Sequence, residues 1–251
     1  MKTWQWIVLI LVSYIIFLIA YIPASFVTGQ IQENSQQQIR FVGVSGTLFS
    51  GAAQALDYKG LRVNDIEWEL SPLYLFMLKA KLNIDSGNIR DVDAISLKGS
   101  VTASLLNTQA LSAQNAQLFI PAKTALSQMQ LPVPVIASGR LRVDVENFEF
   151  DQACVALKGK GSWLNASIDF EQQQTKLGLF EANLSCQSPD FVLQILPDNI
   201  LSLDANVRLQ LDGKFFPEGT YKMPSDFPPA LKAGASLFGV ETSSGTYRID
   251  F

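Results

Sequence analysis

The chain has 251 residues, a formal net charge of −4 and no histidine. This length is enough for one domain of ordinary size and an anchor. The lack of histidine excludes Ser-His-Asp and Cys-His nucleophilic sites and removes the usual metal ligand. Without Lys2, 18 Lys and Arg side chains face 23 Asp and Glu, a net charge of −5, so nothing resembles the basic footprint of a nucleic-acid binder.

No cofactor and no metal site is expected. The sequence contains neither G-x-x-x-x-G-K-[ST] nor G-x-G-x-x-G, the two common nucleotide-binding loops. The glycine-rich stretch 43–51, "GVSGTLFSG", has no lysine and no helix pattern after it, which indicates a strand with glycines at its bends. Two cysteines without histidine make a poor zinc site.

Residues 4–22 are predicted to form a transmembrane helix. Stretch 3–32 holds no charged side chain, and residues 4–22 would span about 28 Å at 1.5 Å per residue. Trp4, Trp6 and Tyr21 lie near the two ends, where aromatic rings prefer the interface, and Ile22 is the last residue of the span. Lys2 precedes the span, which predicts a cytoplasmic tail 1–3 and an exported remainder.

A cleaved signal peptide is the alternative. Its apolar region is typically about 7–15 residues, shorter than this run, and ends at a site flanked by small residues. Cleavage after Ala24 would place the bulky Ile22 where a small residue is required. The sequence therefore favours an uncleaved anchor, a Gln-rich linker over 23–40, and an exported domain over 41–251.

Alternation of apolar and polar residues dominates the exported part, which predicts an all-β domain with a curved, largely antiparallel sheet. Stretch 201–211 alternates throughout and predicts a long half-buried strand. In stretch 140–151 the apolar residues Leu141, Val143 and Val145 occupy odd positions, but Phe148 and Phe150 occupy even ones. A β-bulge near Glu146–Asn147 is needed to keep both sets on one face. The same phase change occurs between Val63 and Ile66.

One or two short helices are predicted. Ser71 followed by Pro72, and Ser188 followed by Pro189, are typical of helix starts. The span 122–137, which contains "LPVPV", is interpreted as a crossing or a loop.

Three carboxylates, Asp65, Glu67 and Glu69, share one face of the predicted strand 61–71. Catalysis and Ca²⁺ binding are conceivable there, but such a row is far more often a solvated surface. No enzymatic activity is expected. Cys154 and Cys186 are predicted to form a disulfide in an oxidising compartment, with two free cysteines as the alternative.

Two motifs carry a resemblance. Gly46, Thr47 and Gly51 lie in "GTLFSG", and Trp68, Leu70 and Pro72 follow in "WELSP". With the N-terminal span, these residues resemble the type II secretion system protein N family, also called general secretion pathway protein N, whose members often have Trp where this chain has Phe49. The resemblance implies a single-pass bacterial inner-membrane protein with a periplasmic β-domain. It implies an accessory role in type II protein secretion, with other secretion envelope proteins as partners.

The alternative function is lipid binding or transfer. Curved sheets of the AsmA-like and lipopolysaccharide-transport families share an anchor and glycine-punctuated strands. In that case apolar side chains of stretch 201–211 should line an open trough that holds lipid: Leu201, Leu203, Val207, Leu209 and Leu211.

Overall fold

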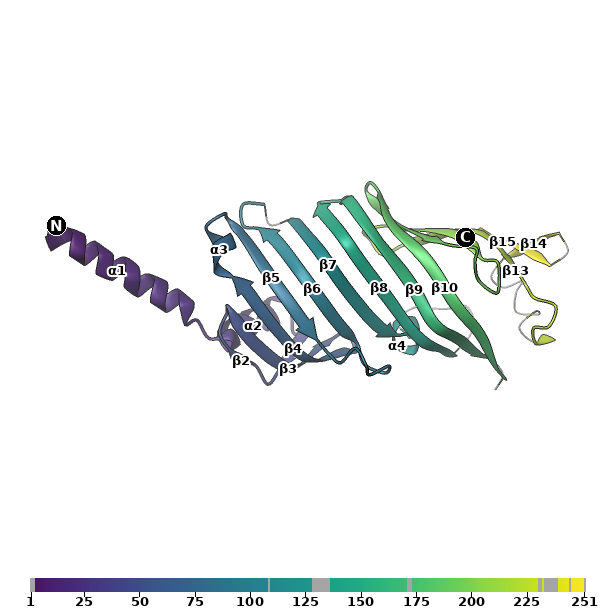
Figure 1. Cartoon of the computed structure of the whole chain (residues 1–251), viewed down its shortest axis with the longest axis horizontal. Helices are drawn as coiled ribbons and strands as arrows, with labels where there is room; N and C mark the ends of the chain where they lie inside the picture. Colours follow the sequence, from purple (N-terminus) through teal and green to yellow (C-terminus); the bar gives the residue numbers. More distant parts are fainter. Residues whose placement is uncertain are drawn as a thin grey trace.

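The computed structural model describes residues 3–107, 109–127, 136–170, 173–229, 232, 239–243 and 245–250. Its centre is one 15-stranded antiparallel sheet in which strands follow one another almost in chain order, β1-β3-β4 through β13 and then β15-β14, with β2 paired to β3 (Figure 1). The prediction of an all-β domain with a largely antiparallel sheet is confirmed.

Two helices precede the sheet. Helix α1 spans Thr3–Ala20 and helix α2 spans Ala24–Asn34, with Pro23 as the residue before α2. Pro fixes its own φ and has no N–H, which suits it to the start of a helix and separates α2 from α1. Much of the predicted linker 23–40 is therefore helical. In the part of the chain that the structure describes, no helix is both long and apolar enough to cross a membrane.

The strands have the following bounds: β1 Ile39–Val42, β2 Ser45–Gly46, β3 Ser50–Tyr58, β4 Leu61–Ser71, β5 Lys79–Ser86, β6 Ser96–Ser104, β7 Ala110–Pro121, β8 Ile136–Asp151, β9 Cys154–Phe170, β10 Gln173–Gln187, β11 Asp190–Ile195, β12 Asp204–Leu209, β13 Phe215–Lys222, β14 Val240–Ser243 and β15 Thr246–Asp250. Helix α3, Pro72–Leu75, connects β4 to β5, and helix α4, Ala122–Leu126, follows β7. Residues 128–135, which include "LPVPV", lie outside the described residues.

Both predicted phase changes are found. The pairing of β8 with β9 shifts between Val145 and Asn147, so Glu146 is the extra residue of a bulge. Asp65, between Val63 and Ile66, has a φ of 50°, a left-handed conformation, and the N–H of Gly87 donates to the carbonyls of both Asn64 and Asp65, as at a bulge. These irregularities keep large apolar side chains on one face along the whole of each strand.

Cross-strand pairing defines an apolar face, called the inner face below. Directly opposite residues of antiparallel strands point to the same side, so the pairs can be followed from β4 to β12. Most of these side chains are half-buried. The inner face comprises Ile66, Trp68, Leu82, Ile84, Leu97, Val101, Ala113, Ala116, Leu118, Leu141, Val143, Val145, Phe148, Leu157, Trp163, Phe180, Ala182, Leu184, Leu193, Ile195 and Val207.

The opposite face, called the polar face below, carries the charges. Lys98 pairs with Asp85 at 2.7 Å, and Arg208 pairs with Glu218 at 3.3 Å. Asp144 accepts hydrogen bonds from Arg142 and from Gln117, at 3.0 and 2.7 Å. Burial raises the pKa of Asp144, but these hydrogen bonds outweigh burial and leave its pKa below the usual value.

The sheet curls toward the inner face at β8 to β11. The rings of Phe148 on β8 and Phe191 on β11 are 6.1 Å apart although β9 and β10 lie between them. Strands are about 4.8 Å apart, so three steps across a flat sheet would separate the two backbones by about 14 Å, and the two rings bridge this distance over the inner face. Gly161 on β9 lies inside the curl: a Cβ there would be 3.8 Å from a methyl group of Leu193 on β11.

A small buried cluster closes one end of the curled strands. Leu177, Phe180 and Phe227 are buried there together with Ala166, and Trp163, Ile168, Leu201, Leu203 and Met223 pack against them. The side chain of Asn199 organises this connection, since it accepts hydrogen bonds from the N–H groups of Leu201 and Leu203. The inner face is therefore covered at this end.

Two predictions from the sequence are wrong. Residues after Pro189 form strand β11 and not a helix, because Phe191, Leu193 and Ile195 pair with β10 and continue its inner row. The long strand predicted over 201–211 is limited to β12, Asp204–Leu209. The trough side chains predicted there separate accordingly: Leu201 and Leu203 pack on the cluster, Val207 stays on the inner face, and Leu209 and Leu211 are exposed.

Candidate functional site

The glycine motif forms a tight hairpin. Gly46 on β2 pairs with Gly51 on β3, and Gly46 has a φ of 85°, which favours glycine. Between them, the N–H of Thr47 donates to the carbonyl of Ser50 at 2.8 Å, and the N–H of Ser50 donates to Oγ1 of Thr47 at 3.2 Å. Thr47 therefore closes the turn with both its backbone and its hydroxyl group.

The second motif lies against the first. Trp68 on β4 is the cross-strand partner of Gly51. A Cβ at Gly51 would clash with the indole ring of Trp68 and lie 2.9 Å from the carbonyl oxygen of Ser45. The glycine therefore provides the space that the tryptophan occupies, which explains why the two residues belong to one pattern.

Leu70 and Pro72 continue this unit toward α3. The N–H of Leu70 donates to the carbonyl of Phe49 at 2.7 Å, and Pro72 is the first residue of α3. On the other side, the N–H of Leu48 donates to the carbonyl of Ile22 at 3.0 Å. The hairpin thus joins the end of the N-terminal segment to the first long strands of the sheet, a contact that the sequence motifs did not predict.

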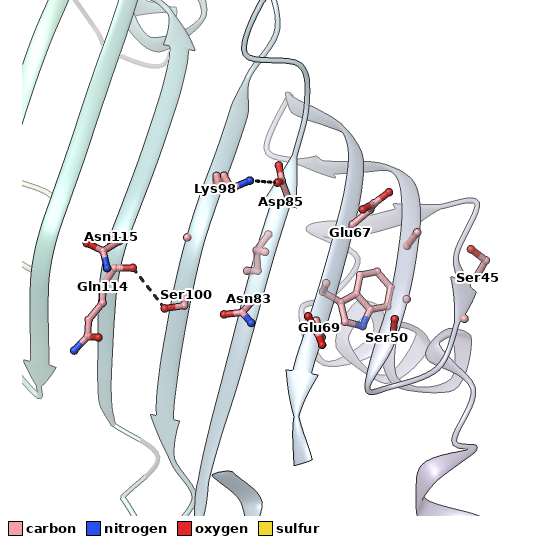
Figure 2. A pocket seen from close by; sticks show the side chains of 16 residues that line it. Ser45, Ser50, Glu67, Glu69, Asn83, Asp85, Lys98, Ser100, Gln114 and Asn115 are labelled. Carbon is pink, nitrogen blue, oxygen red and sulfur yellow. Dashed lines mark hydrogen bonds and ion pairs between the residues drawn. The ribbon is translucent and has the colours of Figure 1, made fainter. Parts of the chain in front are cut away.

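A hollow of about 720 Å³ lies beside the hairpin, over β2 to β7. Figure 2 shows polar side chains of neighbouring strands around it, among them Glu67, Glu69, Asp85 and Lys98. The hydrogen bond and the charge of Asp85 raise the pKa of Lys98, so this lysine stays cationic. Glu67 lies directly opposite Asp85, a like-charge pair that Lys98 partly balances.

The three carboxylates predicted to share one face, Asp65, Glu67 and Glu69, do not form one site in the structure. Asp65 occupies the bulge of β4, while Glu67 and Glu69 line the hollow. Among the described residues, no group of three or more acidic or sulfur ligands is arranged to hold a metal ion. The row has the geometry of a charged strand surface.

The two cysteines are joined in the structure by a disulfide between β9 and β10, with a Cα–Cα distance of 5.6 Å. Cys154 is fully buried and pairs with Phe150, and Cys186 pairs with Phe191. Phe150 in turn is a ring neighbour of Phe148, at 6.3 Å between centroids. The bond therefore fastens the curled strands near the contact between Phe148 and Phe191.

A buried arginine is a feature that the sequence did not indicate. Arg140 donates to the carbonyl of Ile89 and to the hydroxyl of Ser96, and its guanidinium lies 4.3 Å from the ring centre of Phe119. Burial lowers its pKa, and the charge of Asp91 acts against this. Arg140 thus holds connection 87–95 against β6 to β8. Sequence reasoning missed this role, because a polar residue that alternates with the apolar Leu141 is typical of a strand surface.

The aromatic residues of the predicted span are exposed, and Ile22 is half-buried. Trp4 and Trp6 lie in α1 and Tyr21 follows it, and more than half of each side chain is accessible. The ring of Tyr21 stacks on Phe17 at 4.5 Å. These side chains therefore form a surface that the described part of the chain does not cover.

The fold and the hairpin define a single-sheet β-protein with one apolar and one polar face and an apolar helix at its start. A family model for the type II secretion system (T2SS), protein N, matches residues 37–250, and the chain belongs to this family. The resemblance inferred from the two motifs is confirmed.

Curated relatives agree. The chain is 26% identical over 213 residues to the type II secretion system protein N of Vibrio cholerae. This alignment covers 83% of this chain and 82% of the Vibrio protein. It is 24% identical over 247 residues to the protein of that name from Aeromonas hydrophila, covering 97% and 95%. For the Pectobacterium carotovorum protein the identity is 22% over 251 residues. No solved structure gives a significant match.

Proposed function

We propose that the chain is an accessory inner-membrane component of bacterial type II protein secretion that acts through a periplasmic β-domain. The observation that carries this proposal is the family match over residues 37–250, which includes every strand of the sheet. Its partners are other envelope proteins of the secretion system. The hollow contains the ion pair of Lys98 with Asp85, and we assign the chain no reaction.

The anchor is proposed to be residues 4–22, with the tail 1–3 in the cytoplasm and 41–251 in the periplasm. Helix α1 has 18 residues, about 27 Å at 1.5 Å per residue, slightly short of a hydrocarbon core of about 30 Å. Tyr21 and Ile22 extend the apolar segment, and a short span is accommodated by local thinning of the bilayer and by interfacial aromatic residues. The absence of any charge in 3–32 supports this role.

A topology reporter tests the anchor. A reporter enzyme that is active only outside the cytoplasm is fused after Phe251, and the N-terminus of the membrane-extracted chain is sequenced. We expect an active reporter on a chain that still begins at its own N-terminus. A mature chain that begins near Ser25 would contradict the anchor and favour the signal-peptide alternative.

Secretion itself is tested by deletion and complementation. An exported enzyme of the pathway is induced until its export is saturated, and its activity is measured in the medium and in the periplasm. We expect the deletion to shift activity toward the periplasm and the full chain to reverse the shift. An unchanged distribution at saturation counts against a role in secretion.

Lipid binding is the second candidate, favoured by one observation. The inner face is apolar and half-exposed over many strands, and the rings of Phe148 and Phe191 meet over it across two intervening strands. Apolar surface left in water costs about 25 cal/mol per Å², so an acyl chain would stabilise this face.

Adjacent residues of β9 provide a matched test of lipid binding. Gly161 lies on the inner face and Ser162, its neighbour, lies on the polar face. Lipid that remains with the purified full chain is quantified by mass spectrometry after exhaustive detergent exchange. The lipid candidate predicts that Gly161→Phe lowers the amount while Ser162→Phe does not. An equal amount in both variants would show that the lipid only surrounds the anchor.

A further inference from the structure

Two connections at one end of the sheet expose large apolar side chains, and together they are called the apolar tip. The connection from β4 to β5 contributes Leu73, Phe76, Met77 and Leu78, and the connection from β6 to β7 contributes Leu105 and Leu106. The exposed fraction of these side chains lies between 49% and 85%. The N–H of Leu105 donates to the carbonyl of Leu78 at 2.9 Å, so the two connections form one surface.

The composition of the tip is unusual for a connection in water. Of the residues that dominate turns, stretch 72–78, "PLYLFML", contains only Pro72, and it has no Gly, Asn, Asp or Ser. The connection 87–95, at the other end of β5, has the usual chemistry: the side chains of Asn88 and Asp91 accept hydrogen bonds from the N–H groups of Arg90 and Asp93. The contrast lies within one sheet, at the two ends of the same strand, β5.

The tip lies where the N-terminal segment enters the sheet. Ile22 is bonded to Leu48, Leu70 is bonded to Phe49, and α3 begins two residues after Leu70. In Figure 1, α3 lies at one end of β5, on the side of the sheet where α1 lies. The surface ends at Asn107, whose side chain donates to the carboxylate of Asp151 at 3.1 Å.

Two lysines follow the tip in the sequence, and Lys79 lines a hollow together with Glu149 and Asp151. Lys79 and Lys81 follow directly, and the ammonium group of Lys81 lies 5.0 Å from the ring centre of Tyr74. Stretch 72–82 contains no acidic residue. Exposed Leu, Phe and Met next to Tyr and Lys are typical of protein surfaces that enter the headgroup region of an anionic bilayer.

We propose that the apolar tip inserts into the headgroup region of the membrane that holds the anchor. This inference rests on the proposed anchor, because the hydrogen-bonded path from Ile22 places the tip at the membrane side of the domain. Insertion fixes the orientation of the sheet on the bilayer and brings the nearest edge of the inner face close to lipid.

A fluorescent probe measures insertion. Phe76→Cys is labelled with an environment-sensitive dye in the full chain, with the bond between Cys154 and Cys186 verified by mass spectrometry. The matched control is Val92→Cys, which is 62% exposed at the opposite strand ends. Both proteins are reconstituted in vesicles of phosphatidylethanolamine and phosphatidylglycerol. Because both side chains are exposed, neither substitution disturbs packing.

We expect blue-shifted emission at position 76 and strong quenching by lipids with a doxyl group on the acyl chain, and neither effect at position 92. Equal, water-like emission at both positions would overturn the inference. Extraction of the same vesicles with alkaline carbonate reports on the anchor alone, so either proposal can fail without the other. Lys79→Glu with Lys81→Glu should weaken the quenching at position 76. Unchanged quenching would contradict a contribution of these two lysines to insertion.

Discussion

The ring of Phe148 on β8 contacts the ring of Phe191 on β11 across two intervening strands, at 6.1 Å between centroids. Leu157 on β9 is the cross-strand partner of Phe148, and Cys186 on β10 is the partner of Phe191, so these two side chains lie between the rings in the same row. The contact thereby links β8 to β11 over the apolar inner face.

A double-mutant cycle tests this contact. Phe148→Ala and Phe191→Ala should each destabilise the domain by about 1–3 kcal/mol, less than a fully buried phenylalanine, because both rings are half-buried. The double variant should lose less than the sum, with a coupling of about 0.5–1.5 kcal/mol for an aromatic pair. Urea unfolding monitored by circular dichroism gives the values. A coupling near zero would mean that the rings do not meet in solution.

The disulfide should stabilise the domain. The bond closes a loop of 32 residues, which in the chain-entropy model corresponds to about 3–4 kcal/mol. Cys154→Ala with Cys186→Ala should therefore lower the free energy of unfolding by that amount. A reducing agent should have the same effect on the original chain and none on the double variant. Equal stability of oxidised chain and variant would show that the cysteines are not paired.

Gly51→Ala should disturb the motif hairpin. The new methyl group would meet the indole of Trp68 and the backbone of Ser45, an overpacking that costs about 1–3 kcal/mol. Gly29→Ala is the control, because nothing lies within 4 Å of a Cβ there and alanine favours the helix α2. Thermal unfolding compares the two. A neutral Gly51→Ala would contradict the packing described for the motif.

The raised pKa of Tyr221 predicts that the domain loses stability at alkaline pH. Burial, followed by the charge of Tyr247, raises its pKa to about 12 from 10.0. Folding therefore favours the protonated phenol, so its contribution is complete below pH 10 and is lost as pH rises toward 12. Tyr221→Phe should flatten the stability profile over this range, and the exposed Tyr58→Phe should not. If stability fell equally with pH in the original chain and in both variants, the raised pKa would not belong to Tyr221.

The parts of the fold that could be predicted from the sequence are those fixed by neighbouring residues. The bulge at Glu146 was predictable because two sets of large apolar residues in opposite phase require it. Strand β11 could not be predicted, because Ser188 and Pro189 precede it as they would precede a helix. Only the pairing with β10 determines that the segment is a strand. The burial of Arg140 also depends on a distant partner, the ring of Phe119, which alternation along one strand does not reveal.

The candidate site was predicted in part. The two motifs that carry the resemblance, Gly51 and Trp68 among them, were recognised separately, and the structure brings them into contact. The bond of the hairpin to Ile22 and the joining of Leu78 to Leu105 are contacts between distant segments, so neither could be read from periodicity. The apolar stretch 72–78 was visible, but its exposure depends on the sheet.

The most direct test of the central claim is quantitative co-purification of the full chain. The chain carries a C-terminal affinity tag at its native level, is extracted in mild detergent, and is compared by mass spectrometry with a tagged, unrelated single-span periplasmic protein. The account predicts that envelope proteins of the type II secretion system are enriched over this control. Stoichiometric lipid with no enrichment of any secretion protein would contradict it.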